Sequence, residues 1–229
     1  MLTKIVLSAD IVAFTSLDEE LRNQLIEYLN ILIKSLEKDF GTYGRIIKGD
    51  YIEIVVENPV NALTIMLQLK SYIKSFSLNI ENSKNNRLKN FKNYGVRIAM
   101  GYGKLDKYDK EKGIIDGEAI YYSGRKLNEE TKTYNKERIV IKNTLFFISE
   151  NDALNQNINT ILGLIDILIN NATAKQCQIL YFRLLGLTEQ EIAKELDTKQ
   201  PTVNKQLTSI GWNAIEKSIK YFEQIMKQK

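Results

Sequence analysis

Two aspartates, Asp10 and Asp50, lie at positions where folding could bring their carboxylates together around a metal ion. Asp10 ends a short β-prone run that begins at Lys4, and Asp50 follows Gly49 in the tight turn of a hairpin predicted over residues 44–57. In a palm-like sheet, the end of the first strand lies beside the turn between the second and third strands. Two carboxylates there would hold a Mg²⁺ ion bound to nucleotide phosphates. The plainer alternative is that both residues serve only the turn and the strand end, because a Gly-Asp pair suits a hairpin tip.

A second set of polar side chains falls near the C-terminus. A predicted helix starts there, in which Val203 and Leu207, four residues apart, face inward. Its other side chains carry amides and hydroxyls that pair with base edges, and lysines that neutralise phosphate. From Thr173 onward, nine lysines and arginines outnumber six acidic residues, whereas the whole chain carries a net charge of only +4. The predicted DNA contacts are Lys199, Gln200, Thr202, Asn204, Lys205 and Gln206.

The residues that precede this set predict a helix-turn-helix. Thr173 caps a helix that Gly186 closes, and Thr188 with Glu191 forms a capping box at the start of a two-turn helix. The small side chain of Ala193 lets the next helix cross close by. The alternative interpretation is an ordinary three-helix bundle that is used for dimerisation.

Residue types that are missing or rare exclude several classes of site. The chain contains no histidine, which removes Ser-His-Asp hydrolysis and zinc sites that need imidazole. Cys177 is the single cysteine, so no intramolecular disulfide can form. Asp10 interrupts the apolar start of the chain, and Asp166 interrupts its most apolar window, residues 158–169. We therefore expect a cytoplasmic protein with no membrane partner.

The order of the elements predicts the α+β fold class. Residues 3–142 follow the pattern β-α-β-β-α-β-α-β, which implies a mixed sheet with helices on one face, in the manner of a ferredoxin-like palm. The polar stretch 79–93 is expected to be an exposed loop and residues 138–141 a strand, with no strand after about residue 145. The predicted domains are a palm over 1–145, a connecting helix over 146–172 and an all-α helix-turn-helix domain over 173–229.

Both halves of the chain resemble known families. The C-terminal pattern, with the core T-x-x-E-I-A-x-x-L at residues 188–196, resembles the helix-turn-helix of LuxR-type regulators and of sigma-factor region four. The N-terminal half resembles the class III nucleotide cyclases. The segments that carry this second resemblance are ADIVAFTSL (9–17), IIKGDYIEIV (46–55), VRIAMGYG (96–103) and DGEAIYYSGRKL (116–127).

Carried over by position, the cyclase resemblance assigns roles to three residues, and Lys48 is added from its place in the sequence. It implies that Asp10 and Asp50 are ligands of a Mg²⁺ ion and that Arg125 stabilises charge on the phosphate in the transition state. Lys48 lies two residues before Asp50 and would also reach a phosphate, so Lys48 and Arg125 would bind the nucleotide. Their plainer alternatives are a solvated strand charge for Lys48 and a helix surface charge for Arg125.

The sequence departs from the adenylate cyclases at two positions. Ile46 stands where those enzymes have the lysine that reads the purine, and Tyr121 stands where they have the asparagine that orients the ribose. Nearly the whole chain is similar to the SatD family, which pairs a palm-like N-terminal half with a C-terminal helix-turn-helix. That resemblance implies the architecture more than an activity.

These patterns together predict a DNA-binding transcriptional regulator or accessory protein, whose cyclase-like domain senses a nucleotide or dimerises. A binding role is favoured over an enzymatic one. The alternative is a Mg-dependent nucleotide cyclase, or a related nucleotidyl enzyme with a DNA-binding tail, in which Arg125 would be catalytic. A third hypothesis is an interaction module without a ligand. The expected partners are double-stranded DNA, a nucleotide and a second copy of the chain. The second copy is expected because class III palms commonly pair head to tail, which would form a homodimer.

Overall fold

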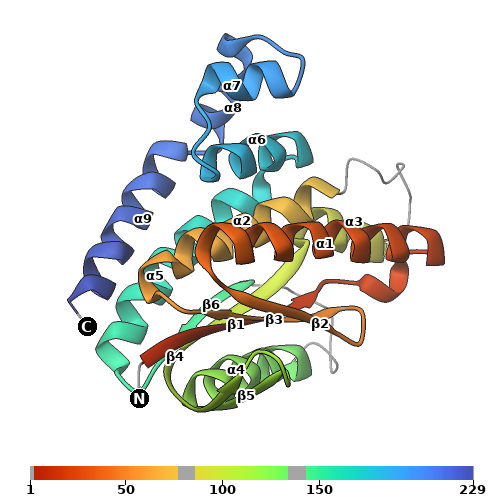
Figure 1. The fold of residues 1–229 in the computed structure, drawn as a ribbon. Coiled ribbons are helices and arrows are strands. Elements are labelled where there is room, and N and C mark those ends of the chain that lie inside the picture. The colour runs from red at the N-terminus through yellow and green to blue at the C-terminus, as the bar shows by residue number, and fades with distance from the viewer. Residues whose placement is uncertain (1–2, 77–85, 134–142, 229) are drawn as a thin grey trace.

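The computed structural model describes residues 3–76, 86–133 and 143–228, which form one mixed sheet and a set of helices (Figure 1). The strand predicted at 138–141 lies outside the described residues. The strands are β1 (Thr3–Ile11), β2 (Tyr43–Ile47), β3 (Tyr51–Val56), β4 (Val96–Asp109), β5 (Ile114–Gly117) and β6 (Leu145–Ile148). The α-helices are α1 (Glu19–Phe40), α2 (Ala62–Phe76), α3 (Asn86–Tyr94), α4 (Glu118–Thr133), α5 (Asp152–Asn171), α6 (Ala174–Leu184), α7 (Glu189–Glu195), α8 (Gln200–Ser209) and α9 (Trp212–Lys227).

The sheet has the order β2-β3-β1-β4-β5, with β6 paired to β4. All pairings are antiparallel except that of β4 with β6. In the register of the central strand β1, Asp10 lies opposite Tyr51 of β3 on one side and opposite Arg97 of β4 on the other. The end of β1 therefore lies beside the turn between β2 and β3.

Helices cover both faces of the sheet, so the prediction of helices on one face is wrong. The helices α1 and α2 lie on one face and α4 lies on the other (Figure 1). The reason is the composition of β1, which is apolar on both sides: Ile5 and Leu7 belong to the main core, and Val6 belongs to a second cluster with Ala119 of α4. The helix α4 packs so closely on β4 that a Cβ atom at Gly101 would meet the carbonyl oxygen of Ala119 at 2.0 Å.

Two short elements differ from the sequence prediction, one in the expected loop at 79–93 and one at the start of the connecting helix expected over 146–172. Residues 86–94 form α3 instead of part of an exposed loop, because Phe91 is fully buried and anchors this otherwise polar helix. Residues 145–148 form β6, although no strand was expected there, and pair in parallel with β4 from Ile98 to Gly101. This four-residue apolar run is too short for its periodicity to identify a strand.

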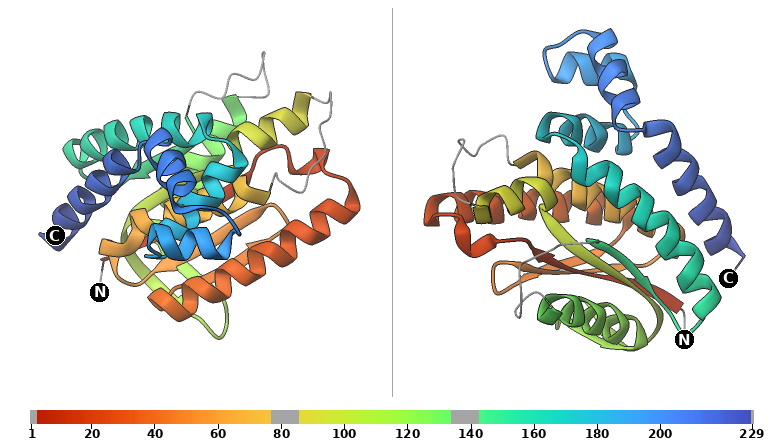
Figure 2. Two further views of the ribbon diagram at one scale, coloured as in Figure 1. Left: turned by 90° about the horizontal axis from the view of Figure 1, so that it is seen from above. Right: turned by 180° about the vertical axis from the view of Figure 1, so that it is seen from behind.

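The helices α6 and α9 share their core with the sheet. Cys177 and Leu180 of α6 and Phe222 of α9 belong to the same buried cluster as Ile5 of β1. A buried hydrogen bond of 3.0 Å joins the side-chain amide of Gln68 in α2 to the carbonyl oxygen of Leu184 at the end of α6. The helix α9 runs back alongside α5 (Figures 1 and 2). None of the described helices is both long and apolar enough to cross a membrane.

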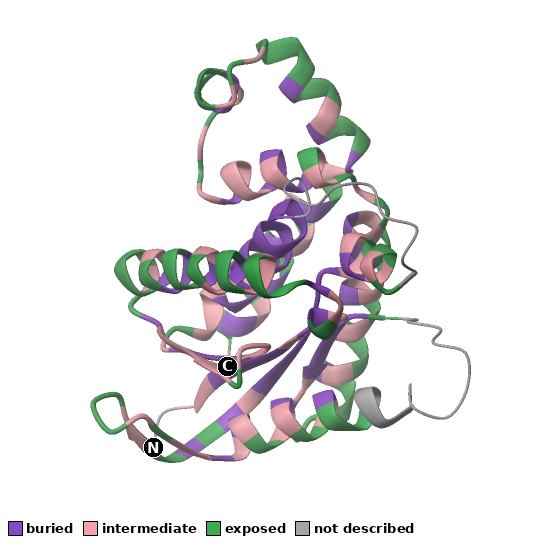
Figure 3. Ribbon diagram, turned by 90° about the vertical axis from the view of Figure 1, so that its right-hand side faces the viewer, coloured by how far each residue is buried: buried purple, intermediate pink, exposed green. Residues whose placement is uncertain are grey.

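The helices α7 and α8 project away from the rest of the molecule (Figures 1 and 2). They form their own small apolar cluster, which α6 completes with Ile179. Thr173 caps α6 and a capping box at Thr188 starts α7, as the sequence predicts. Gln176 completes a capping box at Thr173 as well, which was not predicted. Most residues of α7 and α8 are exposed, in contrast to the mostly buried strands β1 and β3 and the helix α2 (Figure 3). The other members of the cluster are Ile192, Ala193, Val203 and Leu207.

A buried group of polar side chains fastens α2 to the elements around it. The Lys70 ammonium donates to the carbonyl oxygens of Tyr94 (2.7 Å) and Val96 (3.0 Å) and to the hydroxyl of Thr144. Asp166 of α5 lies 3.6 Å from the Lys70 ammonium. One turn further along α2, Lys74 donates to three carbonyl oxygens. We call Lys70, Lys74, Thr144 and Asp166 the buried lysine joint; the acceptors of Lys74 are Asn93 (2.7 Å), Ile169 (2.6 Å) and Asn170 (2.9 Å).

Candidate functional sites

The structure places Asp10 and Asp50 side by side at one edge of the sheet. The backbone N–H of Ile11 donates to the carbonyl oxygen of Asp50 at 3.0 Å, which joins the end of β1 to the turn between β2 and β3. The turn is tight because Lys48 and Gly49 both adopt left-handed backbone conformations, with φ of 56° and 81°. We call Asp10 and Asp50 the carboxylate edge.

The carboxylate edge already contains one cation from the chain. The Arg97 guanidinium forms an ion pair with the Asp10 carboxylate, and the two side chains are only 13% and 19% exposed. Burial raises the pKa of Asp10, the charge of Arg97 acts in the opposite direction, and the charge of Asp50 raises it further. Arg97 was not predicted as a site residue. Its position in a strand that could pair with β1 was the one indication that it lies beside Asp10.

The donor atoms of this edge fit a Mg²⁺ ion. Carboxylate oxygens are the ligands that Mg²⁺ prefers, and the ion usually binds one or two of them while phosphates and water complete its octahedron. The charge of Asp50 raises the pKa of Asp10, so a cation shared by the two carboxylates would relieve their repulsion. Within the described residues, no group of three or more acidic or cysteine side chains gathers in one place. For a metal at this edge, nucleotide phosphates and water would supply the remaining oxygen ligands.

Arg125 lies on the exposed side of α4 and not in the carboxylate edge itself. It lines a surface hollow together with Tyr51 and Glu53 of β3. Because Tyr51 directly follows Asp50, the hollow begins one residue from the carboxylate edge. Lys48 is exposed at the tip of the turn. The structure thus brings Asp10 and Asp50 together, with Lys48 and Arg125 on the neighbouring surface.

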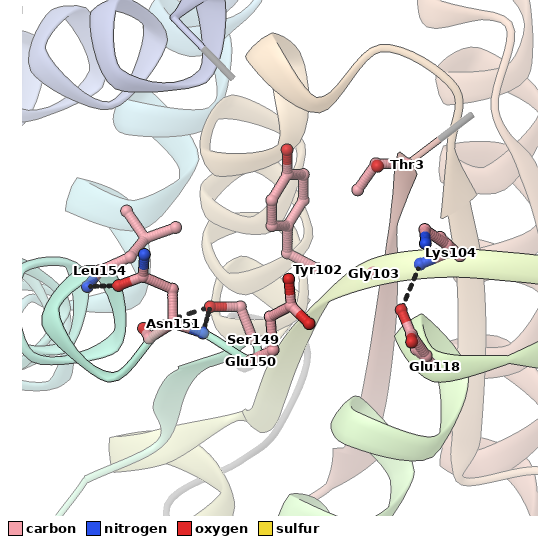
Figure 4. Close-up of a pocket in the computed structure, with 9 residues that line it drawn as sticks. All are labelled: Thr3, Tyr102, Gly103, Lys104, Glu118, Ser149, Glu150, Asn151 and Leu154. Carbon is pink, nitrogen blue, oxygen red and sulfur yellow. Dashed lines mark hydrogen bonds between the residues drawn. The ribbon is translucent and has the colours of Figure 1, made fainter. Parts of the chain in front are cut away.

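A separate cavity of about 200 Å³ lies at the opposite end of β1 (Figure 4). Thr3, at the start of β1, and Tyr102 line it, with one carboxylate from Glu118 of α4 and one from Glu150 before α5. The Glu118 carboxylate accepts a hydrogen bond of 3.0 Å from the backbone N–H of Lys104. None of these residues was predicted from the sequence to belong to a site. Six residues of β1 lie between Thr3 and Asp10, so this cavity is distinct from the carboxylate edge.

The helix α8 presents the predicted polar face. Val203 and Leu207 are buried, at 0% and 3% exposure, so the prediction that they face inward is confirmed. Gln206 is half-buried, and the other five predicted contacts are exposed. Within the described part of the chain, Lys199 and Lys205 form no ion pair. The face therefore carries two lysines whose charge is available to a partner.

Glu189, which the sequence analysis did not single out, also belongs to this surface. Its carboxylate, at the start of α7, accepts hydrogen bonds from the side-chain amides of Gln200 and Asn204. The second of these is 3.0 Å long. Because Glu189 precedes α8 by eleven residues, only the packing of α7 against α8 reveals this contact.

Comparison with solved structures finds nucleotide cyclases. The chain is similar to a bacterial light-regulated adenylyl cyclase in two structures, each with 18% identity and a TM-score of 0.45. The two alignments cover 64% and 63% of this chain and 42% and 74% of the cyclase chains. The adenylyl cyclase CyaB from P. aeruginosa matches with 17% identity and a TM-score of 0.39, over 56% of this chain and 71% of that one.

A guanylyl cyclase matches with 14% identity and a TM-score of 0.38, over 54% of this chain and 68% of its own. No protein-family model and no curated protein matches the sequence. None of these four structures is described as a SatD-family protein or as a DNA-binding protein.

Proposed function

We propose that the N-terminal part of the chain binds a Mg²⁺–nucleoside triphosphate at the carboxylate edge. The observation that carries the proposal is the juxtaposition of Asp10 and Asp50, from two segments 40 residues apart, at the point where β1 meets the β2–β3 turn. The two carboxylates would hold the metal, and Lys48 and Arg125 would contact phosphates from the tip of the turn and from α4. A bound Mg²⁺ would neutralise charge on the phosphates.

The reaction that such a site would support is nucleotide cyclisation, with pyrophosphate as the leaving group. In that reaction Arg125 would stabilise the negative charge that develops on the transferred phosphate. We expect little discrimination between ATP and GTP, because Ile46 and Tyr121 cannot supply the lysine and asparagine contacts of the adenylate cyclases. The same site without turnover would act as a nucleotide sensor.

The test measures binding and turnover separately. The wild-type protein should melt at a higher temperature when ATP or GTP is added with Mg²⁺, because a ligand that binds only the folded chain stabilises it. Asp50→Asn should lose this shift, whereas the matched control Asp106→Asn, at an exposed strand position, should keep it. Formation of cyclic nucleotide by the wild type identifies an enzyme, and a shift without product identifies a sensor. The proposal is wrong if no nucleotide shifts the melting of the wild type.

A second function, binding of double-stranded DNA, is favoured by the exposed face of α8. The helix projects from the molecule together with α7 (Figure 1), and its amides and lysines are exposed while Val203 and Leu207 belong to the apolar cluster beneath. We propose that α7 and α8 form a helix-turn-helix. Two copies of the chain in a homodimer would offer two such helices to half-sites about one turn of DNA apart. The protein would then be a cytoplasmic, nucleotide-responsive DNA-binding regulator.

Titration of duplex DNA at several salt concentrations tests this second function. Binding that weakens steeply with salt is expected, because lysines that contact phosphates displace counterions. Lys199→Ala and Lys205→Ala should each lower the salt dependence by about one counterion, whereas Lys227→Ala, at the far end of α9, should not. Absence of binding to every duplex at low salt would refute the DNA-binding proposal without touching the nucleotide site.

A further inference from the structure

Glu189 holds the two amides that stand on the proposed DNA-reading face. Its carboxylate accepts hydrogen bonds from Nδ2 of Asn204, at 3.0 Å, and from Nε2 of Gln200. The two amides lie four residues apart, on consecutive turns of α8, and both residues are exposed. One acidic residue therefore fixes two adjacent side chains of this face.

The carboxylate leaves each amide only one favourable orientation. An ionised carboxylate accepts hydrogen bonds and has none to donate, so an amide oxygen turned toward it would meet a second acceptor. The amide nitrogens of Gln200 and Asn204 must therefore face Glu189, and their carbonyl oxygens must point away from it. The acceptor-only carboxylate thus distinguishes the amide nitrogen from the amide oxygen, although the two atoms have nearly the same shape.

Glu189 is itself held in place by the start of α7. It is the first residue of that helix, directly after the cap Thr188, whose capping box with Glu191 fixes the first turn. A carboxylate is also favoured at a helix N-terminus, where the backbone N–H groups concentrate positive charge. The amides of α8 thus contact a carboxylate that stands in the capped first turn of α7.

We infer that Glu189 makes α8 selective for adenine in the major groove. Each oriented amide presents one oxygen acceptor and one remaining N–H donor. Adenine offers the complementary pair, the N6 amino group and the N7 acceptor, whereas guanine offers two acceptors, O6 and N7. The Glu189 carboxylate would also repel those guanine acceptors and the DNA phosphates. It would therefore reduce affinity for all duplexes while increasing discrimination between bases.

The test rests on the proposed DNA-binding function and uses the full-length protein. Duplexes that bind are first selected from a random pool, and affinity is then measured for a selected duplex and for copies in which single A·T pairs are replaced by G·C. We expect the wild type to prefer adenine at one or two positions by about 10-fold or more, since one bidentate contact discriminates by that order. Glu189→Gln should bind all duplexes more tightly and lose most of this preference.

Glu195→Gln is the matched control, because it neutralises an exposed carboxylate at the other end of α7. It should keep the adenine preference. If Glu189→Gln discriminates as the wild type does, or if the selected sites carry guanine at these positions, the inference is wrong while DNA binding itself stands. If the wild type binds no duplex, the DNA-binding proposal fails and the adenine preference fails with it.

A measurement on the free protein checks the hydrogen bonds without DNA. The side-chain amide NMR signals of Gln200 and Asn204 should shift on Glu189→Gln and remain in place on Glu195→Gln. Unchanged signals in both variants would refute the orientation of the amides, whatever the result with DNA.

Discussion

The carboxylate edge and the buried lysine joint use the same kinds of residue in opposite ways. At the edge, Asp10 pairs with Arg97, and both side chains remain partly exposed. In the joint, the side chains of Lys70 and Asp166 are 0% and 1% exposed. Each lysine ammonium donates three hydrogen bonds to protein oxygens, which uses all of its N–H groups. The joint has no donor left for a ligand, whereas the edge keeps carboxylate oxygens at the surface. A candidate site keeps donor or acceptor atoms available for a ligand, whereas a structural contact uses them within the chain. Residue type alone does not make this distinction.

The largest expected effect comes from breaking the joint. Asp166→Ala should lower the free energy of unfolding by about 3–5 kcal/mol, because it leaves the Lys70 ammonium buried without its counter-ion. It also removes the acceptor of the Thr144 backbone N–H and hydroxyl. Urea denaturation measures the loss, with Asn157→Ala, an exposed change on the same helix, as the control. A loss below about 1 kcal/mol would show that the joint is not a structural pair of this kind.

The joint should also give stability a characteristic dependence on pH. Burial lowers the pKa of Lys70 from 10.5 to about 8, so between those two values the unfolded chain binds more protons at this position than the folded chain. Stability should therefore rise with pH across this window. The comparison with Lys70→Met isolates the effect, because tyrosines and other lysines titrate in both proteins. A stability difference that stays constant from pH 8 to 10.5 would contradict the lowered pKa.

At the carboxylate edge, Arg97 should act as a replaceable cation. Arg97→Gln should cost about 1–2 kcal/mol without metal, because it removes the counter-ion of the partly buried Asp10. Added Mg²⁺ with nucleotide should restore part of this loss, so the variant should gain more stability from the ligand than the wild type does. Melting curves with and without Mg²⁺–ATP measure the gain. Equal gains in the two proteins would indicate that Arg97 and the metal do not share Asp10.

The smallest effect on stability is expected on α8. Lys199→Ala and Lys205→Ala should change the free energy of unfolding by less than about 0.5 kcal/mol, because both side chains are exposed and form no ion pair within the described residues. Their effect should appear only in DNA titrations. A larger loss of stability in urea denaturation would place these lysines with the joint, as contributors to the fold.

The sequence predicted those caps, turns and buried helix positions that depend on residues close together in the chain. The cap at Thr173, the capping box at Thr188, the Gly49 turn and the inward positions Val203 and Leu207 all depend on neighbours within a few residues. For the same reason, the sequence placed Asp10 and Asp50 at strand and turn ends. Their roles, and those of the α8 residues, remain predictions.

Contacts between distant segments were not predictable in this way. Lys70 meets Thr144 across 74 residues, and Lys74 meets the carbonyl oxygen of Ile169 across 95 residues. Nothing in the α2 sequence distinguishes these lysines from surface lysines, because their burial depends on acceptors supplied by other elements. Arg97 was missed for a similar reason, since its partner is set by the pairing of β1 with β4.

The placement of α7 and α8 between two anchored helices has a practical consequence. The helices α6 and α9 both pack in the main core, whereas the segment 187–209 between them packs in its own small apolar cluster. This segment should be exchangeable as a unit: a related helix pair that keeps the contact with Ile179 of α6 would leave the rest of the protein unchanged. Under the proposed DNA-binding function, such a graft would change which duplex is bound.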